Sequence, residues 1–386
     1  MTRMNKYLAM GIACTLIGAA SQAAEFTHVS TIDLSAQFNS GTGYGSNPLS
    51  VAFDGTNAYV GGFNNNSTAD NIGVVKVSNI FGGSATFSPL APTQFSSPAF
   101  RGLDALGYDS ATSSVLMAHD SGSASTSFIS RRDTAGTNVW TVTNPQSSRP
   151  MAMAVDPIGN GTGSPGVAFG VQGSGRRRLL NMADGTDLYN GSNGGIINSS
   201  PTSFGSAWRG MAFDAAGNIA LSEDTGFMYG VRNTENQWKT LTGTLNATSS
   251  SVAKDGAPQN LVGQGIAIVT GLGSDLLAMS GRNMTQFTDL SGAMTSVDDT
   301  MVHLRNLDGS VGSLTQIALN GAEDGIGTPW TGDIKNLAFG LNGAGDPTLV
   351  VVDFIERRMD VYTVPEPSML GALALAGLVA LRRRRA

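Results

Sequence analysis

The sequence is poor in charge and in the side chains that usually bind metals or act as nucleophiles. Only 13% of its 386 residues are charged, against roughly 25% in ordinary soluble domains. Cys14 is the only cysteine, and it lies in an apolar stretch near the N-terminus. Once that stretch is removed, the chain has no disulfide, no thiolate metal site and no cysteine nucleophile.

Recognisable catalytic patterns are missing as well. The three histidines (His28, His119 and His303) lie far apart, and none has the spacing of a zinc site. The serine-hydrolase pattern G-x-S-x-G does not occur. His119 is followed by Asp120, which leaves either a functional dyad or an ordinary strand end. We therefore assign no catalytic residue and no metal ligands.

The residues that are present favour strands and turns. The sequence contains 50 glycines and many serines, threonines and asparagines, while 41% of its residues are hydrophobic. These polar residues suit turns and the exposed faces of strands, and the apolar share is large enough for a core. We expect an all-β fold.

The N-terminus has the features of an export signal. Arg3 and Lys6 precede the apolar stretch Tyr7–Ala20, and Ser21–Ala23 offers small residues for cleavage. The stretch is shorter than a typical membrane span. We therefore predict a signal peptide over residues 1–23 rather than a permanent anchor.

A hairpin pattern recurs along the body, residues 24–363. It consists of a short apolar strand, an aspartate, a turn and a second apolar strand. The copies begin with "VAFD", "LGYD", "MAVD" and "MAFD", and "IAIV" and "LAFG" keep the two strands without the aspartate. The equivalent positions are Asp54, Asp109, Asp156, Asp214, Val269 and Gly340, which are 55, 47, 58, 55 and 71 residues apart.

A period near 50 residues with several strands per unit is typical of β-propeller blades. We predict a single β-propeller with six blades. The 71-residue spacing leaves room for a seventh, and residues 297–310 contain a further candidate hairpin. A two-sheet sandwich and an irregular solenoid are the alternatives.

The hairpins resemble those of six-bladed propellers of the NHL-repeat and lactonase-like group, chiefly through "FDAAGNIAL" (213–221). This resemblance implies a propeller body. It implies no activity, because such hairpins occur in proteins of unrelated function.

Two sets of residues are candidates for a site in such a propeller. The recurring aspartates Asp54, Asp109, Asp156 and Asp214 can either form their turns or ring a channel and hold Ca²⁺. Arg101 in "AFRG" and Arg209 in "AWRG" each precede an inner strand. They can face a common ligand together with Asp104, or each can pair with a neighbouring aspartate such as Asp104.

The C-terminus carries the most specific motif. "VPEPS" is followed by the apolar run Met369–Leu381, which is too short to cross a bilayer comfortably, and by Arg382, Arg383, Arg384 and Arg385. Under the positive-inside rule these arginines stay on the cytoplasmic side.

Residues 364–386 thus resemble a PEP-CTERM sorting signal, with Pro365, Glu366 and Pro367 as its motif. The resemblance implies export in a Gram-negative-type bacterium, a transient stay in the inner membrane and processing by an exosortase. It also implies a place at the cell surface or in an exopolysaccharide or biofilm matrix.

The charge of the rest of the chain narrows the partners further. Without Arg3, Lys6 and Arg382–Arg385, 17 basic residues remain against 29 acidic ones, a formal charge of −12. An acidic body argues against nucleic acid as a partner. The first functional hypothesis is a non-enzymatic surface or matrix protein that binds glycan or protein. The alternative is a secreted metal-dependent hydrolase or lactonase with its site in the propeller channel.

Overall fold

The computed structural model describes residues 26–65, 70–90, 94–98, 101–123, 125–143, 150–159, 165–171, 177–188, 208–223, 226–232, 238–240, 246–249, 265–272, 274–280, 284–288, 294–296, 301–307, 311–318 and 335–364. Every helix or strand assigned within these ranges is a β-strand, as the composition predicted. The predicted signal peptide and the sorting segment from Pro365 onward lie outside the described residues.

The strands pair in antiparallel sheets, mostly with their neighbours in the chain. From the inside outward, the main sheets are β2 (Asn47–Phe53), β3 (Ala58–Asn64), β5 (Val74–Ser78) and β6 (Thr86–Pro89); β8 (Arg101–Asp109), β9 (Ser114–Asp120), β10 (Phe128–Asp133) and β11 (Asn138–Thr143); β12 (Pro150–Asp156), β13 (Gly166–Val171) and β14 (Arg177–Asn181); β15 (Trp208–Phe213), β16 (Ile219–Glu223), β17 (Gly226–Arg232) and β18 (Trp238–Thr240); β20 (Gly265–Val269), β21 (Leu276–Ser280), β24 (Met301–Asn306) and β25 (Val311–Ala318); and β26 (Lys335–Leu341), β27 (Pro347–Asp353), β28 (Arg358–Thr363) and β1 (Thr27–Asp33).

Two smaller sheets accompany them. One is made of β19 (Asn246–Ser249), β22 (Met284–Thr288) and β23 (Met294–Ser296), and the other of β4 (Asp70–Ile72) and β7 (Phe95–Ser97). The first two main sheets are also joined, because β3 pairs with the start of β8 at Phe63 and Asn64.

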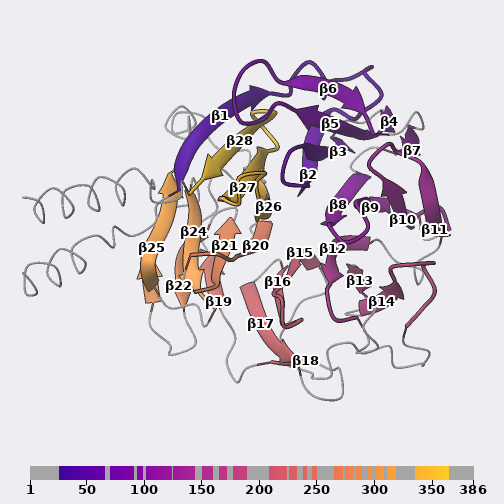
Figure 1. Ribbon diagram of the computed structural model, residues 1–386. Coiled ribbons are helices and arrows are strands. Elements are labelled where there is room, and N and C mark those ends of the chain that lie inside the picture. The colour runs from indigo at the N-terminus through magenta and orange to yellow at the C-terminus, as the bar shows by residue number, and fades with distance from the viewer. Residues whose placement is uncertain are drawn as a thin grey trace, which may run out of the picture.

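The innermost strands form a closed ring. β2 contacts β8, β8 contacts β12, β12 contacts β15, β15 contacts β20, β20 contacts β26, and β26 contacts β2 (Figure 1). Sheets arranged in this way around one axis make a β-propeller rather than a sandwich or a solenoid. The third strands that alternation predicts also pair as expected, for example β10 with β9 and β17 with β16.

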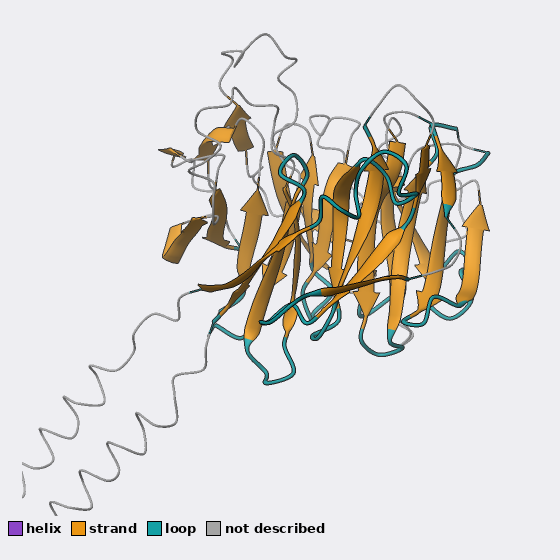
Figure 2. Cartoon of the chain, turned by 90° about the horizontal axis from the view of Figure 1, so that it is seen from above, coloured by secondary structure: helices purple, strands orange, loops and turns teal. Residues whose placement is uncertain are grey.

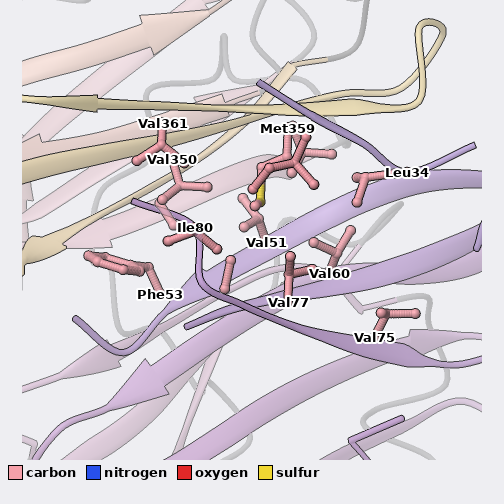
Figure 3. Close-up of a cluster of buried hydrophobic side chains, with 14 of the residues drawn as sticks. Leu34, Val51, Phe53, Val60, Val75, Val77, Ile80, Val350, Met359 and Val361 are labelled. Carbon is pink, nitrogen blue, oxygen red and sulfur yellow. The ribbon is translucent and has the colours of Figure 1, made fainter. Parts of the chain in front are cut away.

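The strands next to the two predicted address segments close the ring. β1 pairs antiparallel with β28, so Thr27 lies opposite Thr363 and Ile32 opposite Met359. The outermost strand of the last sheet therefore comes from the start of the body. A buried cluster seals the junction between the last sheet and the first, and it includes Val51, Val350 and Val361 (Figure 3).

Near the axis, each inner strand repeats a large apolar residue, an alanine or glycine, and a second large apolar residue. The repeats are Val51-Ala52-Phe53, Leu106-Gly107-Tyr108, Met153-Ala154-Val155, Met211-Ala212-Phe213, Ile266-Ala267-Ile268 and Leu337-Ala338-Phe339. Successive side chains of a strand point to opposite faces, so large residues of one strand can meet the small residue of the strand before it. Ala338 accordingly shares a buried cluster with Val51 and Phe53, and Ala267 shares one with Leu337. This alternation lets the strands approach where the ring is narrowest.

The strands run between two faces of the ring (Figure 2). We call the face where the inner strands begin the entry face. The opposite face carries the turns that follow the inner strands, such as Asp54–Asn57, Asp214–Asn218 and Asn342–Asp346, and we call it the turn face. Any ligand in the channel must enter through one of these faces.

The long spacing before Gly340 does not hold another inner strand among the described residues. β24 and β25 take up the candidate hairpin region, and they extend the sheet of β20 and β21 outward. β22 and β23 pair with β19 instead. β20 and β26 are thereby left in direct contact.

Candidate functional site

The central channel is apolar in its side chains. A cavity of about 200 Å³ lies on the axis, and each inner strand contributes the large-small-large triplet described above to its wall. None of these lining side chains is charged. The cavity is smaller than the roughly 300–1,000 Å³ of typical small-molecule sites.

The backbone adds polar groups to this wall. β2, β12, β15, β20 and β26 each pair with a single strand in the described part of the chain. On the free edge of such a strand, alternate N–H and C=O groups face away from the sheet. The channel can therefore accommodate water or a small uncharged molecule, but it contains no acid–base pair.

Towards the entry face the wall becomes more polar. A second cavity of about 40 Å³ is lined by Ser50, Asp104 and Asn336, among others. Ser50 Oγ donates a 2.6 Å hydrogen bond to the carbonyl of Leu103, and Asn336 Nδ2 donates one to the carbonyl of Leu49. These bonds tie β26 to β2 and β2 to β8. Sequence reasoning missed Ser50 and Asn336, whose bonding partners are remote in the chain.

Asp104 lies on a β-bulge. The pairing of β8 with β9 skips from Leu103 to Ala105, and Asp104 is only 7% exposed. Bulges redirect a side chain and are frequent beside functional sites. Of the predicted ligand-binding residues, Asp104 is the one that lines a cavity of the channel.

The same bulge recurs in other inner strands. It falls at Leu49 in β2, Met151 in β12 and Arg209 in β15, each five residues before the aspartate of its turn. Arg209 is therefore the counterpart of Asp104. Arg101 lies eight residues before Asp109, so "AFRG" and "AWRG" do not occupy equivalent places. Only the backbone of Arg209 is among the described parts.

Arg101 pairs with an aspartate of the adjacent strand. Its Nε lies 3.5 Å from Oδ2 of Asp120, whose side chain is fully buried. The other carboxylate oxygen of Asp120 accepts a 2.7 Å hydrogen bond from the N–H of Gly122. The sequence suggested an aspartate partner for Arg101 but pointed to Asp104. Asp120 could not be chosen from spacing alone, because strand pairing brings it close.

The recurring aspartates form their own turns. In Asp54, Oδ1 accepts hydrogen bonds from the N–H groups of Thr56 and Asn57, and Oδ2 accepts one from the Asn57 amide. Asp214 repeats this arrangement with Ala216 and Asn218. The turn role is thus confirmed.

The carboxylates of Asp109 and Asp156 also bond to backbone N–H groups two residues further on. Among the described residues there is no group of three histidine, cysteine, aspartate or glutamate side chains that could hold a metal ion. Binding of Ca²⁺ remains a prediction.

The strand-end histidine is a core residue. His119 is 3% exposed, and its ring centroid lies 4.6 Å from that of Phe128 and 5.8 Å from that of Phe95. Burial lowers the pKa of His119 to about 4, against the opposing effect of the Asp120 carboxylate. Asp120 is engaged with Arg101, so the two neighbours serve different contacts.

A charged cluster lies at the ring closure. Asp360 of β28 accepts a hydrogen bond from the hydroxyl of Thr31 in β1, and Nε2 of His28 lies 3.6 Å from its Oδ1. Arg358 Nε lies 3.4 Å from the other oxygen. Burial raises the pKa of Asp360, and Thr31, Arg358 and His28 oppose this shift. The cluster joins the first strand to the last and lies away from the channel.

The predicted sorting residues Pro365, Glu366, Pro367 and Arg382–Arg385 lie outside the described residues. Within the described ranges, no helix is long and apolar enough to span a membrane.

Comparisons with known proteins concern the fold. No model of a known protein family matches the sequence, and no curated protein matches it. Among solved structures, it is similar to an auxiliary nutrient binding protein from Bacteroides thetaiotaomicron, with 10% identity over 89% of this chain and 74% of that one and a TM-score of 0.49.

Two enzymes show a similar likeness. A virginiamycin B lyase from Staphylococcus aureus has 12% identity over 88% of this chain and 100% of that one, with a TM-score of 0.45. A gluconolactonase from Xanthomonas campestris has 11% identity over 90% and 99%, also with a TM-score of 0.45. The architecture of this chain rests on its own strand pairing.

Proposed function

We propose that this chain is an exported cell-surface or matrix protein, in which a six-bladed propeller is delivered by removable segments at both ends. The propeller has one blade for each inner strand. Its role is to bind a glycan or protein ligand rather than to catalyse a reaction.

The observation that carries this proposal is where the fold ends. The N–H of Val364 donates a 2.9 Å hydrogen bond to the carbonyl of Pro347, and Val364 is 4% exposed. The next residue, Pro365, has no N–H and cannot extend the ladder. The sheet is thus complete one residue before the Pro-Glu-Pro motif, so processing there would remove no contact of the closed ring.

The proposed route has three steps. The signal peptide directs export, the apolar run Met369–Leu381 holds the chain briefly in the inner membrane, and an exosortase-type enzyme acts near Pro365–Pro367. The body then reaches the surface or matrix of a Gram-negative-type bacterium, where exopolysaccharide or surface proteins are its partners. Its acidic charge fits such partners better than nucleic acid.

We place the ligand at the entry end of the channel, beside Asp104, with Arg101 and Arg209 as further contacts. Support comes from the position of Asp104 on a bulge in the cavity wall. The hydrolase alternative has less support, because Asp54 and Asp214 use their oxygens within their own turns. A thermal-shift series with Ca²⁺ tests that alternative, since a specific site stabilises the fold as the ion is added.

The sorting proposal is tested by fractionating cells that possess an exosortase. Three tagged chains are compared: the full chain, a chain lacking Arg382–Arg385, and a chain with alanine at Pro365, Glu366 and Pro367. We expect the full chain to be shortened and to leave the inner membrane, and both variants to keep their tails and remain behind. The same tail length and location for all three would overturn the proposal.

A further inference from the structure

We propose that the turn face of the propeller faces the bilayer while the tail is inserted, so that the entry face and Asp104 point away from the membrane. This inference rests on the proposed sorting function and adds an orientation to it. The partner of the turn face is the lipid headgroup surface.

Strand direction places the exit of the tail on the turn face. β27 begins beside the Asn342–Asp346 turn and β28 ends beside it, since Thr348 lies opposite Thr363. β1 starts at the same edge, because Thr27 also lies opposite Thr363. Both chain ends of the body therefore leave from this face, next to each other.

The connection to the apolar run is short. Five residues separate Val364 from Met369, and a fully extended chain spans at most about 3.6 Å per residue, or about 18 Å. β27 has 7 residues, which corresponds to about 23 Å between the two faces at 3.3 Å per residue. With the apolar run in the bilayer, the tail-bearing edge of the turn face stays close to the lipid surface. The entry face lies about one strand length further away.

The turn face also carries an exposed apolar side chain at this edge. Leu341, at the end of β26, is 51% exposed, the largest fraction among the exposed large hydrophobic residues of the described part. It pairs with Pro347, the residue that anchors Val364. An exposed leucine beside the exit of the tail suits the interfacial layer of a bilayer.

Carboxylates on the same face limit the contact to particular lipids. Asp54 and Asp346 are half-buried in turns of this face, and Asp184 is exposed in the turn after β14. These negative charges are repelled by anionic headgroups. We therefore expect the face to approach a zwitterionic surface more closely than an anionic one.

The chain is well suited to a direct test, because Cys14 is its only cysteine and lies in the predicted signal peptide. Two single-cysteine variants of the tailed chain without its signal peptide, Ala344→Cys and Glu356→Cys, mark opposite ends of β27. Both side chains are exposed, and the local turn bonds come from backbone N–H groups that the substitutions retain. Thr56→Cys is a second marker for the turn face, in another blade.

Each variant carries a fluorophore and is reconstituted in phosphatidylcholine vesicles whose headgroups bear a nitroxide quencher. We expect quenching at position 344 to be at least about twice that at position 356, because contact quenching acts over a few ångströms and the labels differ by about one strand length. Position 56 should resemble position 344. In detergent the difference should vanish.

Flotation of the vesicles separates the two ideas under test. Chains that float with equal quenching at 344 and 356, or with stronger quenching at 356, overturn the orientation alone. A chain that fails to float overturns the anchoring role of the tail and the orientation with it. Position 344 quenched selectively in floating vesicles supports both.

Discussion

The phenol of Tyr59 donates a 2.8 Å hydrogen bond to Oδ2 of Asp54, and Tyr229 makes a bond of the same length to Asp214. Tyr59 comes from the second strand of its sheet, whereas Tyr229 comes from the third. Two blades thus hold the turn aspartate with a tyrosine from different strands. The aspartate serves the turn in both.

Replacing Tyr59 by phenylalanine should lower the free energy of unfolding by about 1–2 kcal/mol, because the bond runs to a carboxylate and Tyr59 is fully buried. Tyr229→Phe should cost a similar amount. Urea unfolding measures both. Tyr108→Phe is the matched control, since its ring stacks on Tyr59 at 6.4 Å but no hydrogen bond of its hydroxyl is present in the described part. Equal losses for all three variants would contradict this role of the phenols.

Gly107→Ala should stabilise the fold by about 0.5–1 kcal/mol, because alanine restricts the unfolded chain more than glycine does. A Cβ at this position would meet only Leu116, at 3.8 Å, and the equivalent residues of the other inner strands are alanines. Gly62→Ala is the contrasting variant. Its Cβ would lie 1.5 Å from the carbonyl oxygen of Tyr44, so we expect a loss of at least about 3 kcal/mol. Thermal and urea unfolding distinguish the two, and a stable Gly62→Ala protein would refute the close approach of this loop.

Ala338→Leu should destabilise the ring by about 1–3 kcal/mol, because the larger side chain must fit beside Val51 and Phe53 at the junction of the last and first blades. Ala344→Leu, in the exposed turn of the same blade, should change stability by less than about 0.5 kcal/mol. If the two variants were equally stable, the small residues near the axis would not be a packing requirement.

The burial of His119 predicts a pH dependence of stability. Its folded pKa of about 4 lies below the ordinary value of 6.5, so the unfolded chain binds the proton more tightly. The contribution is fully present above pH 6.5 and is lost as the pH falls towards 4. Its size is about 3 kcal/mol, from 1.36 kcal/mol per pKa unit.

His119→Leu removes this titration and keeps an apolar residue beside Phe95 and Phe128. The difference in unfolding free energy between wild type and variant should therefore shift against the wild type as the pH falls from 7 to 4. A difference independent of pH would show that His119 does not titrate in this way.

Local patterns were enough to predict most of the fold. The inner hairpins and several third strands follow from alternation and from the repeated "xAFD"-type segment, because each copy records the same narrow position near the axis. Ring closure by β1 was not predicted. Pairing between Thr27 and Thr363 joins the two ends of the body, and neither segment carries a local signal for the other.

The candidate site was only partly predictable for the same reason. Turn chemistry at Asp54 and Asp214 is local, and it was identified correctly among the alternatives. The pairing of Arg101 with Asp120, and the different registers of Arg101 and Arg209, depend on a bulge and on strand pairing. A shared tetrapeptide such as "AFRG" and "AWRG" does not encode that register.

The most direct test of the account compares the urea unfolding of residues 24–364 with that of residues 24–386 in the same mild detergent. If the ring is complete at Val364, the two free energies of unfolding agree within about 0.5 kcal/mol. A shorter chain that is less stable by several kcal/mol would show that the tail belongs to the fold, and would contradict its role as a removable address.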